Sequence, residues 1–422
     1  MIGVGRAGAV REAEPSAAPA MVDEAVGRNA GRAWAGWSSL DLAVLDAADE
    51  RPYWLALSLV PGIGPVSFGR ILARHGSARR GWERGQALLT ELDRVPAEAA
   101  GELRRLQRIG PRGLHRKLED AVSRSGGRIV TAMDDRYPPA LAATDPRPPV
   151  LYVCGDDESL TCGAVAVVGT RRASGYGRSV AIQVADLLAR SGIAVVSGLA
   201  LGIDGEAHAA ALDAGGRTVA VLPSPLDRVY PPRHRTLAAR IVAAGGALVS
   251  ELAPGQLPGR PDFARRNRII AGLARATVIV EAPDRSGALL TAAAAVALGR
   301  DVYAVPGPID AVASRGCNRL IADHLAALVT SPAALLTAIG MRSPASVPGS
   351  SSVAGLSESE AMVLARLLMR PASVDELLGP TRLSTGALAS ALTLLEARGL
   401  VESYGGATFH PTLSARRLAR LR

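Results

Sequence analysis

The sequence predicts an α/β protein built on an extended Rossmann-like, doubly wound parallel sheet. From Ala164 onward, short and almost purely apolar segments alternate with longer helical segments. Apolar strands of this kind are typical of a parallel sheet that helices cover on both faces. Strands are expected at 165–168, 194–197, 219–222, 248–250, 278–281 and 302–305, and helices between most of them, for example at 178–190 and 288–298.

A leader and a helical domain precede the sheet. Residues 1–45 are rich in Ala, Gly and Arg without a sustained period, which predicts a disordered leader. Residues 50–120 have a helical pattern, with helices at 53–59 and 66–74 around the turn Pro61–Pro65. The turn resembles that of a helix-hairpin-helix or SAM-like domain, whose amides can contact a DNA phosphate, but similar turns often only pack helices together. DNA contact at this turn is left open.

The Rossmann-like domain is expected to span residues 126–338, with an early strand at 128–131 before a proline-dense connection. Residues 341–356, rich in Ser, Pro and Gly, predict a linker. Residues 357–411 predict a winged-helix domain, and residues 412–422 a basic tail. The winged-helix elements are expected as helices at 357–369, 373–378 and 384–398 and a hairpin at 401–410 around Gly405 and Gly406.

Charge and composition limit the partners. The formal net charge is +9, which favours an anionic partner such as nucleic acid, although arginine is spread through the chain and Lys117 is the one lysine. The predicted winged helix differs: Leu356–Pro411 holds four arginines against six acids. Because charge carries most non-specific DNA affinity, we expect this domain to contact a protein or the rest of its own chain.

The cysteine pattern and hydropathy favour a protein of the cytoplasm. The three cysteines have no CxxC spacing and no nearby histidine, which argues against a zinc site or a disulfide framework. No apolar run reaches the roughly 20 residues of a membrane span, and no signal-peptide pattern is visible at the N-terminus. Because the cysteines have neither metal-binding spacing nor a nearby histidine, no metal is expected.

The usual cofactors of such a sheet do not fit this sequence. After the first strand, Gly169, Gly175 and Gly177 do not make GxGxxG, and the second strand ends at Ser197 where a ribose-binding acid would stand. A P-loop is excluded because Lys117 follows Arg116 and not a glycine. The strand ends instead carry small residues, a helix start and a guanidinium group, and these groups suit the phosphates of a polynucleotide. The residues are Thr170, Arg171, Ser197, Gly198, Ser286 and Gly287.

Ordered blocks of residues over about 50–338 resemble the DNA-processing protein A family (DprA, also called Smf). The blocks run through 169–177, 197–208, 263–272, 281–287 and 306–307. The resemblance implies a single-stranded DNA-binding protein without catalytic residues, which dimerises and loads RecA recombinase onto the strand during transformation. The DNA pocket that it implies here comprises Thr170, Arg171, Ser197, Gly198, Arg260, Phe263, Arg266, Asn267, Ser286 and Gly287.

Several of these residues have a second interpretation. Phe263 can stack on an unpaired base or simply anchor the segment before Arg266 in the core. Arg266, Asn267 and Arg268 can contact phosphates or hold that segment by internal hydrogen bonds, and we expect a structural role for at least one. Glu281 is expected to orient an arginine.

Asp204 and His208 would share one face of a helix, as a metal or acid/base pair does. No third ligand or nucleophile has matching spacing, so a structural role for Asp204 at the helix start is favoured. Two rival functions remain. One is a Rossmann-fold nucleotide-processing enzyme similar to phosphoribohydrolases, although Ser286, Gly287 and Ala288 stand here in place of the PGGxGT-type helix start of those enzymes. The other is a transcriptional regulator that works through the winged helix.

Overall fold

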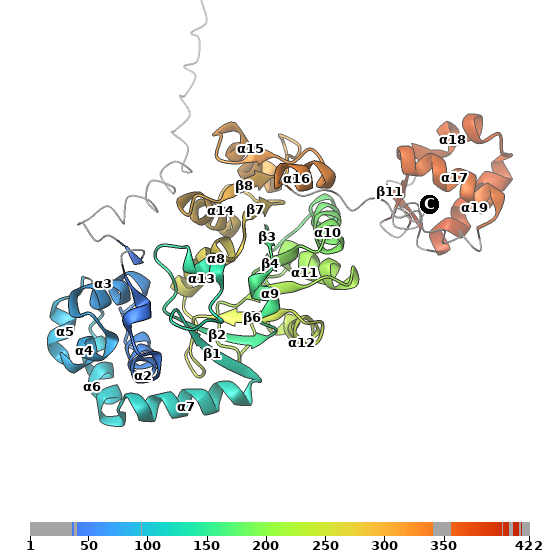
Figure 1. Ribbon diagram of the computed structural model, residues 1–422. Coiled ribbons are helices and arrows are strands. Elements are labelled where there is room, and N and C mark those ends of the chain that lie inside the picture. The colour runs from blue at the N-terminus through green and yellow to red at the C-terminus, as the bar shows by residue number, and fades with distance from the viewer. Residues whose placement is uncertain are drawn as a thin grey trace, which may run out of the picture. The chain divides into compact units, whose positions relative to one another are not determined.

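The computed structural model describes residues 36–37, 40–93, 95–340, 356–398, 400–404, 408–412 and 415. The chain divides into two compact units, residues 1–343 and 344–422 (Figure 1). No helix in these described ranges is long and apolar enough to cross a membrane.

The first unit is built on a nine-stranded sheet with the order β1-β2-β6-β5-β4-β3-β7-β8-β9. The strands from β3 onward pair in parallel, whereas β1 and β2 pair antiparallel with each other and β2 pairs antiparallel with β6. The predicted doubly wound α/β fold is confirmed. The strands are β1 (Gly127–Thr131), β2 (Val150–Gly155), β3 (Ala164–Val168), β4 (Ala194–Ser197), β5 (Thr218–Val221), β6 (Ala247–Ser250), β7 (Ala276–Ile279), β8 (Asp301–Ala304) and β9 (Ala327–Leu328).

Helices cover both faces of the sheet because successive strand residues point to opposite sides. In β3, Ala166 and Val168 join one apolar cluster, and Val165 and Val167 join another. The first face is covered by α8 (Pro139–Ala142), α13 (Arg260–Leu273), α14 (Gly287–Ala297) and α15 (Arg315–Ala322). The second face is covered by α10 (Gly175–Arg190), α11 (Ile203–Asp213), α12 (Arg235–Ala243) and α16 (Pro332–Ala338). A short helix, α9 (Glu158–Thr161), lies between β2 and β3.

The N-terminal helices pack directly on the end of this sheet. They are α2 (Ala47–Ser58), α3 (Pro65–His75), α4 (Ala78–Glu83), α5 (Gln86–Thr90), α6 (Ala99–Ile109) and α7 (Pro111–Arg124). Leu55 of α2 and Val122 of α7 are fully buried in one cluster with Tyr152 of β2. The helical segment and the sheet therefore share a core within the first unit.

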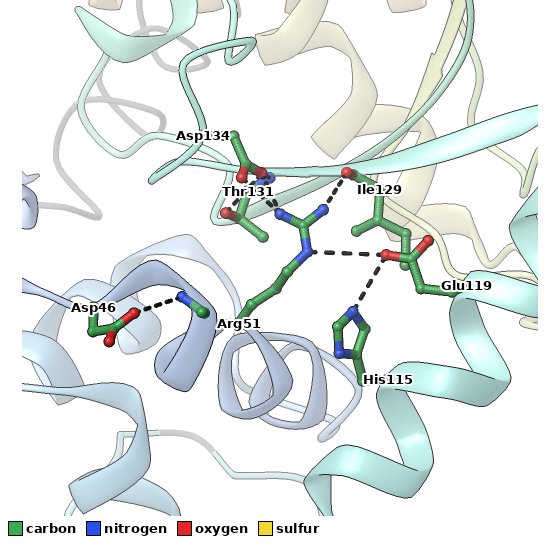
Figure 2. Close-up of polar contacts among 8 residues, drawn as sticks. Asp46, Arg51, His115, Glu119, Ile129, Thr131 and Asp134 are labelled. Carbon is green, nitrogen blue, oxygen red and sulfur yellow. Dashed lines mark hydrogen bonds and ion pairs between the residues drawn. The ribbon is translucent and has the colours of Figure 1, made fainter.

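Arg51 adds a polar contact across the same seam (Figure 2). Its Nη1 lies 2.6 Å from the Oδ1 of Asp134, and its Nη2 donates to the carbonyl oxygen of Ile129 at 2.6 Å. Its Nε lies 3.9 Å from Glu119, which also contacts His115. Side chains from α2 and α7 thus meet the strand β1 and the turn after it.

The sequence predicts a disordered leader over residues 1–45, and Trp37 contradicts the end of that range. Its side chain is fully buried, and its ring stacks on Phe68 with centroids 6.1 Å apart. Its backbone amide donates to Asp145 and its Nε1 donates to the carbonyl oxygen of Pro65. Trp37 therefore belongs to the core of the helical segment; residues 1–35 lie outside the described residues.

The second unit is a winged helix, as predicted. It contains α17 (Glu358–Met369), β10 (Ala372–Ser373), α18 (Val374–Thr381), α19 (Thr385–Ala397), β11 (Val401–Tyr404) and β12 (Thr408–Pro411), with the strand order β10-β12-β11. Capping boxes begin α17 at Ser357 and α18 at Ser373. The predicted linker up to residue 355, the hairpin glycines and all of the predicted tail except Thr412 and Ala415 lie outside the described residues.

Candidate nucleic-acid interface

A cleft of about 350 Å³ opens at the carboxyl ends of β3 and β7. The crossovers that follow these neighbouring strands lead to opposite ends of the sheet, because β4 lies on the far side of β3 and β8 lies on the far side of β7. Ligands of doubly wound sheets bind at this point. The cleft is lined by Gly169, Thr170 and Arg171 after β3, by Phe263, Arg266 and Asn267 of α13, and by Arg285, Ser286 and Gly287 before or at the start of α14.

One wall of the cleft is suited to anions. Ser286 caps α14, its Oγ accepting from the amide of Ala288, and Gly287 is exposed at the first helical position. A helix N-terminus carries partial positive charge and free amides. Arg171 and Arg285 are both exposed, and among the described residues neither contacts a carboxylate. These groups can bind phosphates without first breaking an ion pair.

The other wall is aromatic. The guanidinium carbon of Arg171 lies 5.6 Å from the ring centroid of Phe263, and Tyr230 meets the same ring edge to face, also at 5.6 Å. Phe263 is half-buried and Tyr230 is exposed. A smaller hollow of about 40 Å³ lies beside them and is shared with Gly198 and Arg266. Phe263 is therefore accessible for stacking and also packed, so both of its predicted roles fit.

Arg266 lies beneath both walls as a buried cation. Its side chain is 8% exposed, its Nη1 donates to the carbonyl oxygens of Gly198 and Val221, and its Nε donates to Asn267. Burial, with a smaller contribution from nearby Arg171, lowers the pKa of Arg266 to about 10, and Asp204 opposes the shift. A Cβ on Gly198 would collide with this guanidinium. The positive charge under the cleft is thus held by backbone oxygens and needs a glycine beside it.

The next two residues of α13 are also used internally. The Nδ2 of Asn267 donates to the carbonyl oxygen of Gly287 at 3.1 Å, which ties α13 to the start of α14. Arg268 pairs with Glu251 and reaches the carbonyl oxygen of Pro146. The predicted structural role for at least one member of this run is confirmed, and it extends to all three.

The loops after β3 and β4 hold each other in place. Gly202 has a φ of +78°, and a Cβ there would meet the carbonyl oxygens of Thr170 and Arg171. The hydroxyl of Ser197 is fully buried and donates to the carbonyl oxygen of Val167 at 2.7 Å. Ser197 can therefore shape the floor of the cleft, but its side chain does not reach a ligand.

The carboxylates near the cleft are also occupied. Asp204 is buried and accepts from the amide of Gly198 at 3.1 Å; burial raises its pKa, and backbone hydrogen bonds and Arg266 oppose the shift. This confirms the predicted role at the helix start. The expectation that Glu281 orients an arginine is wrong, because Glu281 accepts from the amide and hydroxyl of Ser174 at 2.8 and 2.6 Å.

His208 pairs with Thr218 and not with Asp204. Its Nδ1 lies 2.7 Å from the Oγ1 of Thr218 in the core. Burial, and then repulsion by His234 and Arg266, lowers the pKa of His208 to about 3. Among the described residues, no three His, Cys, Asp or Glu side chains are grouped as metal ligands would be.

Of the ten predicted pocket residues, the cleft brings seven together; Ser197 and Gly198 lie below it. Arg260 is the first residue of α13, and its side chain lies outside the described residues. Arg285 and Tyr230 were not among the ten. The rule that ligands bind at the carboxyl ends of parallel strands, here called the strand-end rule, could have found both residues, because each lies in a loop that follows such a strand.

The helix-hairpin-helix-like turn lines a second cleft of about 490 Å³, whose opposite side is formed by the segments after β5 and β6 and by α13. Gly62 and Gly64 line it together with Glu98, Glu251 and Arg265. DNA contact at this turn stays an open prediction.

Two family models match this chain. The family model described as DNA recombination-mediator protein A matches residues 128–340, and the model of the DprA winged helix domain matches residues 347–407. Protein Smf of Synechocystis is 32% identical over 85% of this chain and 98% of its own length. The chain belongs to the DNA recombination-mediator protein A family.

Other members of the family are similarly close. The DNA processing protein DprA of Mycobacterium tuberculosis is 38% identical over 86% of this chain and 92% of its own length. The X-ray structure of DNA processing protein A from Streptococcus pneumoniae matches with a TM-score of 0.57 and 32% identity. It covers 68% of this chain and 95% of that one.

Proposed function

We propose that this member of the family binds single-stranded DNA in the cleft at β3 and β7 and passes the strand to RecA recombinase. The observation that carries the proposal is the pair of exposed arginines, Arg171 and Arg285, which share the cleft with the N-terminus of α14 and have no carboxylate partner among the described residues. Unneutralised guanidinium groups beside a helix N-terminus favour phosphate binding.

The shape and the aromatic wall favour an unpaired strand. A cleft of about 350 Å³ has the size of a small-ligand site, which suits single nucleotides of an unpaired strand. Phe263 and Tyr230 offer ring surfaces to a base that is free to leave its stack, and stacking of this kind contributes about 1–3 kcal/mol per base. No feature of the cleft requires a particular base, so the expected binding is tolerant of sequence.

We infer that binding occurs without turnover. The carboxylates that could act as a base beside the cleft, Asp204 and Glu281, are buried and hydrogen-bonded within the protein. A phosphoribohydrolase needs a free carboxylate at the sugar. Incubation with nucleoside monophosphates should release no nucleobase, and measurable release would revive the enzyme as an alternative.

The transfer to RecA and the pairing of two copies are further parts of the proposal. Membership of a recombination-mediator family supports both, and a protein that serves RecA would work in the cytoplasm. RecA ATPase on DNA coated with a single-strand-binding protein should rise when this chain is added, and light scattering should give a dimer. An unchanged ATPase rate would limit the function to DNA binding.

The winged helix is proposed to contact a protein or the rest of its own chain, and not DNA. Exposed residues of α19, the helix that would enter a groove, are nearly all uncharged: Thr385, Gly386, Ala387, Ala389, Ser390, Thr393 and Leu394, with Glu396 the exception. Duplex binding by the segment 350–422 with a steep salt dependence would contradict this.

The DNA-binding proposal is tested by fluorescence anisotropy with a labelled dT oligomer and a duplex of the same length. We expect the single strand to bind at least about tenfold more tightly than the duplex. Equal affinity for the two would remove the case for a site that takes unpaired DNA.

A further inference from the structure

A run of exposed cations follows α6 and α7 on the outside of the helical segment. We call the six residues Arg104, Arg108, Arg112, Arg116, Lys117 and Arg124 the α6–α7 basic stripe, and all six side chains are exposed. Residues 104–124 hold seven cations and two acids in the sequence, a net charge of +5 within a chain whose formal charge is +9. More than half of the excess charge of the protein therefore arises within residues 104–124.

The stripe has no carboxylate partners, whereas most other cations of the helical segment have them; Arg80 is the exception. Arg70 contacts Asp93, Arg79 contacts Glu83, and Arg74 and Arg84 both contact Glu91. In the stripe, Arg104 reaches only the amide oxygen of Gln86, and the other five make no hydrogen bond or ion pair with any described residue. Their charge is thus available to an external anion.

The fold presents this charge on a rigid surface. Leu114, Leu118 and Val122 bury one side of α7 against α2 and the sheet. The opposite side carries four of the stripe cations with the exposed carboxylate of Asp120 among them, so that the net charge of this face stays positive. At about 1.5 Å per residue, the 14 residues of α7 extend for about 21 Å, long enough to follow several phosphates.

We propose that the α6–α7 basic stripe is a second contact surface for the phosphate backbone of DNA, used by the part of a strand that extends beyond the cleft. This inference rests on the proposed function. A polyanion with regularly repeated charge matches a row of unpaired cations on one helix face, and such contacts fix a strand without reading its sequence. The cleft would hold the bases, and the stripe would hold the strand that continues from it.

The test uses the full chain and two dT oligomers, one of about 6 nucleotides, within the usual length of a single-strand site, and one of about 40. The variant Arg108→Gln/Arg112→Gln/Arg116→Gln removes three stripe charges. Its matched control, Arg74→Gln/Arg79→Gln/Arg84→Gln, removes three paired charges from the same helical segment. A third variant, Arg108→Lys/Arg112→Lys/Arg116→Lys, keeps the charge. Thermal unfolding checks that all of them fold.

We expect the Gln stripe variant to bind the long oligomer at least about tenfold more weakly, with a salt slope shallower by about 2, since each lost contact to a single strand removes about 0.7. The short oligomer should bind as in wild type, and the control and Lys variants should bind both oligomers normally. An unchanged salt slope for the long oligomer overturns the inference. The inference is also overturned if the Gln stripe variant loses binding to anionic phospholipid vesicles while it binds both oligomers as wild type does. If Arg171→Ala weakens neither oligomer, the proposed function itself fails.

Discussion

The guanidinium of Arg171 lies against the ring of Phe263, with its central carbon 5.6 Å from the ring centroid. The two residues come from different elements, the loop after β3 and the first turn of α13. The charge that attracts a phosphate and the ring that can receive a base are therefore adjacent. Binding of a nucleotide here would use both at once.

Replacing Phe263 by leucine should weaken single-strand binding. Leucine keeps apolar contact with Tyr230 but removes the ring on which a base can stack, so we expect the dissociation constant for a dT oligomer to rise about tenfold. Anisotropy titration measures this, and urea unfolding shows whether stability is retained. If affinity stays at the wild-type value, Phe263 serves only as a packing residue.

Adding one methyl group should have opposite consequences at two glycines of the site. A Cβ on Gly198 meets the buried guanidinium of Arg266, so Gly198→Ala should lower the free energy of unfolding by about 1–3 kcal/mol. A Cβ on Gly287 meets nothing, and Gly287→Ala should leave stability unchanged or raise it by about 0.4–1 kcal/mol. Urea unfolding of both proteins tests the pair. Equal stability would mean that Arg266 can move aside at little cost.

His208 should make the fold sensitive to acid. Burial lowers its pKa from 6.5 to about 3. Between pH 6.5 and about pH 3, the imidazole of residue 208 is protonated in the unfolded chain but not in the folded chain. The stability that neutral His208 allows is therefore complete above pH 6.5 and is lost as the pH falls. The loss approaches about 1.4 kcal/mol per pH unit.

Urea unfolding of wild type and His208→Gln at pH 7, 6 and 5 isolates this contribution. The raised pKa of Asp204 acts in the opposite direction but is common to both proteins. We expect the stability of the variant to fall less steeply below pH 6.5. Parallel pH profiles would show that the folded protein accommodates a protonated His208.

Trp37 should be essential to the helical segment. It is fully buried between Phe68 and Trp54, and Arg147 lies over its ring at 5.7 Å. Trp37→Ala should cost about 3–5 kcal/mol in the free energy of unfolding, whereas Trp37→Phe should cost less. Differential scanning calorimetry distinguishes the two. A negligible effect of Trp37→Ala would restore the interpretation of this segment as a leader.

The sequence predicts the parallel part of the fold well because each strand there is a local, uninterrupted apolar run. β4 has the predicted bounds, and the edges of β3 and β5 differ by one residue. The strand β2 was missed, although Val150–Cys154 is equally apolar. It follows a proline-dense segment and pairs antiparallel with β6, about 95 residues later, and the alternation of strands and helices gives no sign of such a pairing.

The site was predictable only where its chemistry follows from chain position. Arg171, Ser286 and Gly287 stand directly after strands or at a helix start, and the strand-end rule places them correctly. The burial of Arg266 has no such signal. Its partners are the carbonyl oxygens of Gly198 and Val221, which lie 68 and 45 residues away, and in a chain so rich in arginine a buried one resembles the rest.

Whether the cleft holds single-stranded DNA is tested by comparing Arg171→Ala with Arg172→Ala in a salt titration of dT-oligomer binding. Both residues are exposed in the loop after β3 and carry the same charge, but only Arg171 lines the cleft and contacts Phe263. We predict at least about tenfold weaker binding and a shallower salt slope for Arg171→Ala, with Arg172→Ala close to wild type. Equal behaviour of the two variants would show that the cleft does not hold the strand.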